Sequence, residues 1–509
     1  MTTRAVVIGA GPNGLAGAIR LAEAGVETTV LEAQAQPGGA VRTEELTLPG
    51  FRHDTFSSVY PAGAASPVFA RLPLADHGLE WVHPHVAMAH PLDDGRAVGL
   101  YRDVDATVAS LDGQHPGDGQ SWARYVAPYL RHFEAVRETM LAAFPPVGGP
   151  MKLLTRAGPV PAAQFGLLVA TSAVTLGRRL FSASGSRAWL LGAAAHGDTP
   201  VDDRGSAVAG FYLNLLAHVA GWPSPRGGAQ ALTDALVGHL RALGGEVICD
   251  ARVERILTAG GRARGVVLGD GRRYDAAVVL ADVMPRALLA TTGDALTGWY
   301  RAGLVRFRHG PATVKLDWAL DGTIPWSAAE ARGAGTVHVG GDASSTIAAL
   351  AAPDVGLPPF LLLGQQSIAD PTRAPEGKHT AWAYTHAPAY VGAKLASERS
   401  VHAIEAQVER FAPGFTKRIL ARHVLGPDEL QARNANLVHG DVGGGSYRGL
   451  QSVFRPLPTL SPYRTPLSGL FLASAATFPG GAVHGVSGDA AARAALRSLK
   501  LNKRAASRS

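Results

Sequence analysis

The stretch Ala5-Val6-Val7-Ile8-Gly9-Ala10-Gly11-Pro12-Asn13-Gly14 decides the fold of this chain. Its apolar first part predicts a buried parallel strand, and its glycines match the pattern G-x-G-x-x-G. Apolar residues then recur at helical spacing from Leu15 to Ala22, and residues 28–31 predict a second strand that ends at Glu32. This order of strand, glycine-rich turn, helix and strand predicts a Rossmann-type unit that binds a dinucleotide.

Each glycine of the motif has its own physical function. Gly9 permits the tight turn, Gly11 lets the backbone approach a pyrophosphate, and Gly14 lets the helix pack closely against the strand. The N-terminus of the helix offers N–H groups and a positive dipole end to the phosphates. Glu32 is placed to accept hydrogen bonds from ribose hydroxyls, so the motif favours an adenosine with a free 2′-OH.

A second glycine pair narrows the identity of the nucleotide. The segment Pro37-Gly38-Gly39-Ala40-Val41-Arg42-Thr43 follows the motif directly. The stretch from Val6 to Thr43 resembles the flavin-binding start of the flavoproteins that include amine oxidases and carotenoid desaturases. This resemblance implies that the nucleotide is FAD and that the glycine pair and Arg42 lie against it.

The C-terminal part carries a narrower resemblance. Gly469-Leu470-Phe471-Leu472 and then Phe478-Pro479-Gly480-Gly481-Ala482-Val483-His484-Gly485 look like the end of phytoene dehydrogenase-like proteins. That group includes bacterial relatives and a mitochondrial branch named after pyridine nucleotide-disulfide oxidoreductases. In it, the second segment places backbone N–H groups beneath the flavin. Ala473-Ser474 stands where such sequences carry a glycine, so this chain departs from the pattern at one contact.

The resemblance predicts FAD contacts on separate parts of the chain. Val253 matches a position whose backbone meets the adenine, and Asp282 ends a predicted strand near the nucleotide. The predicted contact residues are Gly9, Ala10, Gly11, Pro12, Asn13, Gly14, Glu32, Ala33, Gly38, Gly39, Arg42, Val253, Asp282, Gly480, Gly481, Ala482 and Val483.

Candidate catalytic residues follow from position alone. In the resembled group, the segment that corresponds to residues 50–61 passes near the flavin on its way to the substrate side. His53 and Asp54 in this segment, together with His484, are therefore the candidates for acid–base catalysis. In the alternative interpretation His53 and Asp54 serve the structure, as ionisable loop residues often do. No metal site is predicted, because the histidine pair at 83 and 85 has no third ligand nearby in sequence.

Composition limits the class of protein. A chain of 509 residues with 46% apolar and 17% charged residues is expected to fold into more than one domain. The net charge is +7, but Arg497, Lys500, Lys503, Arg504 and Arg508 gather in the last residues and predict a solvated basic tail. No nucleic-acid-binding motif accompanies them. The single cysteine excludes an intramolecular disulfide, and the start of the chain predicts a cytoplasmic protein.

The segments combine into a mixed α/β architecture, α+β overall. An FAD-binding Rossmann-type domain alternates along the chain with a substrate domain of mostly antiparallel sheet and helices. Strands are expected over residues 246–257, 263–268 and 274–281. The FAD-binding domain is predicted over residues 1–75, 227–300 and 436–496, the substrate domain over 76–226 and 301–435, and the basic tail over 497–509.

Three segments of the substrate region suggest how it is built. The alternation in residues 313–318 predicts a sheet with one wet face that carries Lys315 and Asp317. A helix from Ser121 has an aromatic face that fits either a tunnel for a long apolar substrate or ordinary core. The apolar segment 165–181 fits either a buried helix or a helix in a membrane interface, which would give peripheral membrane contact.

The resemblance implies an FAD-dependent oxidoreductase of the phytoene desaturase type. We expect oxidation or isomerisation of a carbon–carbon bond in an apolar polyene, lipid or secondary metabolite, with hydride transfer to the flavin. Two alternatives stay open. One is a flavin amine oxidase, and the other is a protein that keeps FAD for structure and serves in binding or assembly.

Replacing Gly11 with leucine should abolish FAD binding, because a side chain there would occupy the path of the pyrophosphate. The flavin absorbance of the purified variant is the measurement. A variant that retains flavin at the wild-type stoichiometry would contradict the assignment of the motif.

Overall fold

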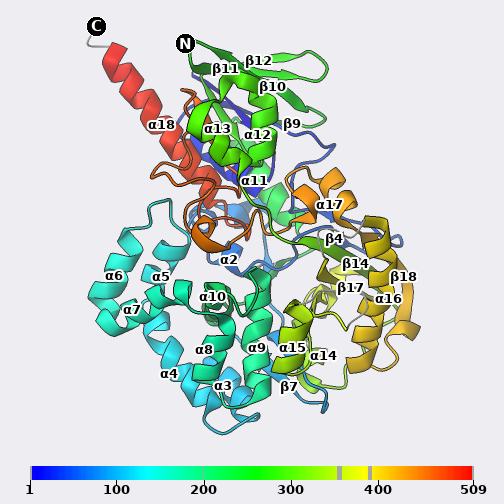
Figure 1. Cartoon of the computed structure of the whole chain (residues 1–509). Helices are drawn as coiled ribbons and strands as arrows, with labels where there is room; N and C mark the ends of the chain where they lie inside the picture. The colour runs from blue at the N-terminus through cyan, green and yellow to red at the C-terminus, as the bar shows by residue number, and fades with distance from the viewer. Residues whose placement is uncertain (1–2, 198, 352–357, 388–392, 507–509) are drawn as a thin grey trace.

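The computed structural model describes residues 3–197, 199–351, 358–387 and 393–506. Figure 1 shows two parts. The upper part holds the N-terminal strand and the C-terminal helix, and the lower part holds a group of helices on the left and a large sheet on the right. This arrangement confirms the predicted mixed α/β fold class.

A parallel sheet of five strands supports the glycine-rich turn. Every pair in it is parallel. The order is β19 (Leu470–Leu472), β13 (Val278–Ala281), β1 (Arg4–Ile8), β2 (Glu27–Leu31) and β9 (Glu246–Ile248). β13 and β19 are buried throughout, as expected for strands covered on both faces. Strands from distant parts of the chain therefore complete one sheet.

The helix that follows the turn is held by two others. α1 (Pro12–Glu23) contacts α11 (Gln230–Ala242) and α18 (Val486–Ala506). A Cβ atom on Gly488 would lie 1.7 Å from the carbonyl oxygen of Asn13, and one on Gly17 would lie 3.0 Å from the carbonyl oxygen of Gly488. α1 and α18 thus cross backbone to backbone, beside the start of α1.

The C-terminal helix is longer than the sequence suggests. α18 runs to Ala506, so the predicted tail from residue 497 is helical through that residue. Residues 507–509, and the side chains beyond Lys500, lie outside the described part of the chain. In the described ranges, no helix is both long and apolar enough to cross a membrane.

Two predicted strands are each divided in the structure. β10 (Val253–Ala259), β11 (Arg262–Leu268) and β12 (Arg273–Asp275) form a separate antiparallel sheet. The predicted strand 246–257 is therefore wrong as one unit, because the chain leaves the parallel sheet after β9, and Asp250 adopts a positive φ of 50°. The predicted strand 274–281 divides likewise into β12 and β13.

A sheet of seven strands forms the substrate domain. Its pairs are antiparallel except for β15 with β6. The strands, in order across the sheet, are β18 (Ile419–Leu425), β14 (Ala312–Leu320), β17 (His379–Ala387), β16 (Leu361–Gly364), β15 (Ala334–Val339), β6 (Val86–Pro91) and β7 (Ala97–Leu100).

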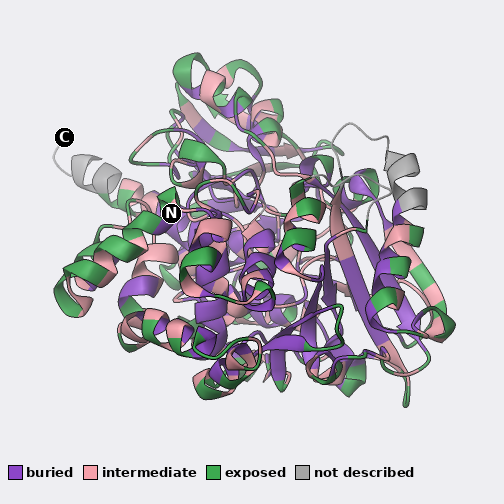
Figure 2. Cartoon of the chain, turned by 60° about the horizontal axis from the view of Figure 1, so that its bottom comes forward, coloured by how far each residue is buried: buried purple, intermediate pink, exposed green. Residues whose placement is uncertain are grey.

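The wet face predicted for this sheet is wrong. All of β14 is buried, with Lys315 3% and Asp317 0% exposed. The two charged side chains pair with each other, and the lysine lines an internal cavity. Figure 2 shows the strands of this sheet largely in purple, the colour of buried residues. Alternating polarity here reflects an enclosed polar surface rather than solvent.

A layer of helices covers the other side of the cavity. Trp122 and Tyr129 are fully buried and each contacts the ring of the buried Phe211, so this part of the aromatic face is core. The helices of the layer are α3 (Val104–Asp112), α4 (Asp118–Arg131), α5 (Phe133–Met140), α6 (Gly148–Ala157), α7 (Pro159–Leu167), α8 (Ala173–Leu180), α9 (Ser184–Ala194) and α10 (Ser206–Ala220).

Shorter elements complete the two parts. The hairpin β3 (Thr43–Glu44) with β4 (His53–Asp54) leads from the glycine pair toward the substrate domain. The others are β5 (Trp81–Val82), β8 (Ser224–Pro225), α2 (Pro61–Ala64), α12 (Pro285–Thr292), α13 (Gly298–Val305), α14 (Ala329–Arg332), α15 (Ala343–Ala351), α16 (Ala393–Phe411) and α17 (Pro427–Arg433).

Replacing Gly488 with alanine should lower the free energy of unfolding by about 3 kcal/mol or more, since the new methyl group meets rigid backbone. Thermal or denaturant unfolding measures this loss. Gly166 in α7 is the matched control, because a Cβ there meets nothing within 4 Å. Gly166→Ala should be neutral or stabilise by up to about 1 kcal/mol. Equal stability of the two variants would contradict the close crossing.

Candidate active site

The predicted nucleotide-binding segments converge at the N-terminus of α1. Glu32 accepts hydrogen bonds from the N–H groups of Ala10 at 2.8 Å and Gln34 at 2.9 Å. Asp282 accepts one from the N–H of Gly14 at 2.9 Å. Two carboxylates from the ends of β2 and β13 therefore fix the glycine-rich turn in its shape.

The second glycine pair packs onto this turn. The N–H of Gly38 donates to the carbonyl oxygen of Ala10 at 3.0 Å, and a Cβ on Gly39 would lie 3.0 Å from the Cα of Gly11. The start of β10 joins them, since the N–H of Ala251 donates to the carbonyl oxygen of Glu32 at 2.8 Å. Val253 and Ala33 are thus near the tip of β2, and their contact with adenosine stays a prediction.

Arg42 shows that these segments fit an anionic cofactor. Its side chain is 4% exposed, and its Nε has no hydrogen-bond partner among the described residues. Burial lowers the pKa of the guanidinium, with Glu44 opposing the shift. A buried cation with an unused N–H beside a glycine cradle is suited to an anionic or acceptor group. The residues present therefore fit FAD, as predicted.

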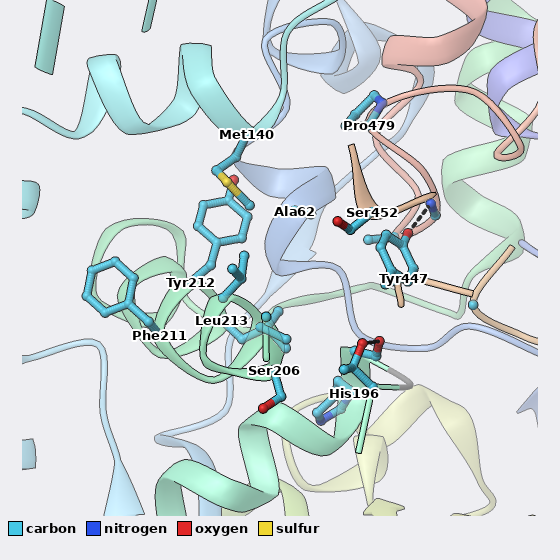
Figure 3. A pocket seen from close by; sticks show the side chains of 18 of the residues that line it. Ala62, Met140, His196, Ser206, Phe211, Tyr212, Leu213, Tyr447, Ser452 and Pro479 are labelled. Atoms are coloured by element: carbon cyan, nitrogen blue, oxygen red, sulfur yellow. Dashed lines mark hydrogen bonds between the residues drawn. The ribbon is translucent and has the colours of Figure 1, made fainter. Parts of the chain in front are cut away.

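The C-terminal motif is a strained loop. Ala482 and Val483 have positive φ angles of 83° and 50°, which cost energy in residues with a side chain. Tyr447 and Tyr463 hold the loop: the hydroxyl of the first accepts from the N–H of Gly481 at 2.7 Å, and that of the second donates to the carbonyl oxygen of Phe478 at 2.9 Å. Figure 3 shows the bond to Tyr447 as a dashed line.

A cavity of about 1480 Å³ extends from this loop into the substrate domain. At the cofactor end it is lined by Ala40 and by the loop Pro479–His484 except Gly480. Figure 3 shows side chains from the helical layer and from the loop around it. The helical side is apolar and includes Met140, Leu141, Leu153, Phe165, Leu168, Phe211 and Leu213.

The sheet side of the cavity is more polar. β14, β15 and β17 contribute Thr313, Lys315, Thr336, Trp382 and Tyr384 to the lining. His196, labelled in Figure 3, lies beside them, with its Nε2 2.9 Å from the Nε2 of His338. Burial lowers the pKa of His196 to about 4, so the imidazole is neutral near pH 7. The cavity therefore has an apolar wall and a hydrogen-bonding wall.

The structure places the three predicted catalytic residues differently. His484 lines the cavity, accepts from the N–H of Val486 at 3.1 Å, and has its pKa lowered to about 4 by burial. His53 and Asp54 are not among the residues that line the cavity. Burial, reinforced by Lys315, lowers the pKa of His53 to about 3, and its Nε2 lies 2.7 Å from the hydroxyl of Thr47.

Asp54 is surrounded by donors. It accepts from Thr43 at 2.8 Å, from the N–H of Ala229 at 2.8 Å, and from Ser58 and Arg373. These partners come from both domains, so its surroundings match the structural interpretation. A catalytic function of His53, Asp54 or His484 stays a prediction.

Lys315 lines the cavity, although the sequence pattern did not predict it as a site residue. Its Nζ donates to both carboxylate oxygens of Asp317, at 2.5 and 2.6 Å, and lies 5.9 Å from the ring centre of Trp382. Burial raises the pKa of Asp317 to about 6, while Lys315 opposes the shift. The signal was present in the sequence as two charges within an apolar strand. The alternation of polar and apolar residues, taken by itself, predicted that both charged side chains face solvent.

The fold and the cavity define a flavoprotein oxidoreductase. The sequence model of the flavin-containing amine oxidoreductases matches residues 13–496, and the chain belongs to this family. The cofactor is accordingly FAD. Relatives within the family include pyridine nucleotide-disulfide oxidoreductase domain-containing protein 2 of Mus musculus, which is 29% identical over 97% of this chain and 94% of its own length.

Other relatives confirm the predicted resemblance to the phytoene dehydrogenase-like branch. The lycopene-forming phytoene desaturase of Pseudescherichia vulneris is 25% identical, over 97% of this chain and 98% of that protein. Among solved structures, an oxidoreductase from Methanosarcina mazei superposes with a TM-score of 0.64 at 18% identity, covering 97% of this chain and 100% of that one. This second similarity concerns the fold.

FAD affinity should increase as the pH falls. Burial raises the pKa of Asp282 to about 7, with the N–H of Gly14 opposing and Glu32 reinforcing the shift. Above that pH the ionised carboxylate would repel a pyrophosphate bound at the N-terminus of α1, and below it the repulsion would be lost. Between about pH 8 and pH 6 the dissociation constant of FAD should fall roughly 3- to 10-fold. Flavin fluorescence titration of the reconstituted apoprotein measures it.

The Asp282→Asn variant is the control for this prediction. Its amide oxygen can still accept from the N–H of Gly14, but the side chain does not titrate. The pH dependence should therefore largely disappear. If the dissociation constant of FAD depends on pH in this variant as it does in the wild type, a group other than Asp282 is responsible.

Proposed function

We propose that the protein oxidises or isomerises a carbon–carbon bond in an apolar polyene, lipid or secondary metabolite. The cavity is the observation that carries this proposal. Its volume of about 1480 Å³, which includes the space at the cofactor end, exceeds the range of roughly 300–1,000 Å³ typical of small-molecule pockets. Its helical wall is apolar, and its cofactor end is formed by the loop predicted to lie beneath the flavin.

The charge of the lining favours this substrate class over amines. Among the described residues, the carboxylates that line the cavity are Asp202 and Asp203. Asp202 is exposed, and Asp203 forms an ion pair with Arg448 at 2.6 Å. The described part of the deep wall therefore offers no carboxylate to hold an ammonium group. The similarity to the phytoene desaturase of Pseudescherichia vulneris supports the same substrate class.

Different residues of the chain have different functions in the proposed reaction. Bound FAD supplies a two-electron acceptor for hydride. The apolar wall holds the substrate and excludes water, which makes the geometry of the reacting bond reproducible. Near pH 7, the neutral imidazoles of His196 and His484 serve as hydrogen-bonding groups. Desaturation also releases a proton from the neighbouring carbon, and the carboxylate of Asp317, which pairs with Lys315 of the lining, is a group in the sheet wall that can accept it.

Anaerobic reduction of the flavin tests the proposal. The purified holoenzyme is mixed in turn with polyenes, lipids and amines, and the absorbance of oxidised flavin is followed. For oxidation, the expected result is bleaching by a polyene or lipid. For isomerisation, it is a product with a shifted double bond and no bleaching. Bleaching by amines alone would favour an amine oxidase. Binding without reduction or product would favour a binding or assembly protein.

Filling the cavity should slow this reaction. Leu213→Trp adds bulk to the apolar wall and should lower the rate of flavin reduction by about tenfold or more at equal substrate concentration. Leu460→Trp is the matched control, because Leu460 is 72% exposed and does not line the cavity. Both variants should keep the wild-type flavin spectrum. A wild-type rate of flavin reduction in Leu213→Trp would contradict binding of the substrate in this cavity.

A further inference from the structure

A cluster of apolar side chains faces solvent on α6, α7 and the turn that follows. We call it the apolar face, and it consists of Val147, Met151, Leu154, Val160, Leu167 and Val169, each between 46% and 65% exposed. No residue of α7 is buried. Figure 1 shows both helices at the left margin of the molecule, and Figure 2 shows much of the surface there in green, the colour of exposed residues.

This face is unusual for a water-soluble surface. A surface helix normally buries its apolar stripe and turns a polar face to water. α7 has the sequence PVPAAQFGL, in which Gln164 is the single residue with a polar side chain. Contiguous exposed apolar side chains of this kind mark a surface that meets another apolar phase or partner.

The apolar face borders the mouth of the cavity. Gly166, Val169 and Ala170 line the cavity and are themselves exposed. Across the mouth, the exposed Leu450 and Val453 line it from the loop that follows Tyr447. Apolar side chains thus flank the mouth on both sides, and the cavity continues their surface inward.

Basic residues lie in the stretch of chain that carries the apolar face. From Thr139 to Gly197 the sequence contains no aspartate or glutamate. The same stretch carries Lys152, which forms an ion pair with Glu138, and Arg156, Arg178 and Arg179, which are exposed. An apolar helix surface bordered by cations suits the interface of a bilayer with anionic headgroups.

We propose that the apolar face docks on an anionic lipid surface, with α7 and the following turn among the acyl chains. The mouth of the cavity then opens toward lipid, so a hydrophobic ligand passes into the protein without crossing water. A symmetric contact with a second copy of the chain is disfavoured, because it would bring the same arginines together. The docking does not depend on which reaction the protein catalyses.

Vesicle co-sedimentation of the holoenzyme tests the docking without any turnover. Vesicles of phosphatidylcholine with about 30 mol% phosphatidylglycerol should bind the protein at least roughly tenfold more tightly than vesicles of phosphatidylcholine alone. The double variant Val160→Asp with Leu167→Asp should lose roughly tenfold or more of this binding. Its flavin spectrum and melting temperature should stay near the wild-type values, since both side chains are exposed.

Val305→Asp is the matched control. Val305 is 67% exposed on α13, in the part of the molecule away from α6 and α7, and its replacement should leave vesicle binding unchanged. Binding that is lost equally in both variants would overturn the docking, and so would a wild-type protein that does not bind. A dimer in solution that only the Val160/Leu167 variant dissociates would also overturn it, because the face would then belong to a second copy.

Discussion

The first turn of α1 has room for backbone only, and much of the cofactor domain depends on this constraint. A side chain at Gly14 would meet the carbonyl oxygen of Gly9 at 2.0 Å, and one at Gly488 would meet that of Asn13 at 1.7 Å. In the second glycine pair, a Cβ at Gly39 would lie 3.0 Å from the Cα of Gly11. Three separate segments therefore share one small volume at the N-terminus of α1, the place where a phosphate would bind.

The two domains are joined by buried polar groups as well as by an apolar cluster that contains residues of both. Asp54 accepts hydrogen bonds from Thr43 of the hairpin, from the N–H of Ala229 and from Arg373, which belongs to the segment 301–435 of the substrate domain. His53 lies 3.7 Å from Asp317 of β14. Such contacts are directional, and they fix the orientation of the sheet relative to the glycine segments more narrowly than apolar packing would. The shape of the cavity depends on that orientation.

The sequence predicted the cofactor domain far better than the reactive part of the cavity. The glycine motif has local physical causes, and its spacing specified β1, α1 and β2 almost to the residue. Strand ends were less predictable, because Asp250 turns the chain out of the sheet without a glycine or proline to signal it. Lys315 was assigned to solvent, since alternation records polarity and cannot distinguish water from an enclosed cavity. The apolar segment 165–181 had two interpretations as one helix, but in the structure it contains the end of α7, where no residue is buried, and α8, which buries Ala173, Leu176 and Gly177.

The parallel sheet also constrains how the chain reaches its native state. β1 near residue 4 pairs with β13 near residue 280, which in turn pairs with β19 at residues 470–472. Pairing over such separations carries a large loop-closure entropy and tends to make folding slow. During synthesis the first glycine-rich turn leaves the ribosome long before its last partners, Gly488 and β19, exist. The nucleotide site is therefore completed only near the end of translation. β1 has an open edge until β13 has been synthesised, and β13 then has an open edge until β19 follows.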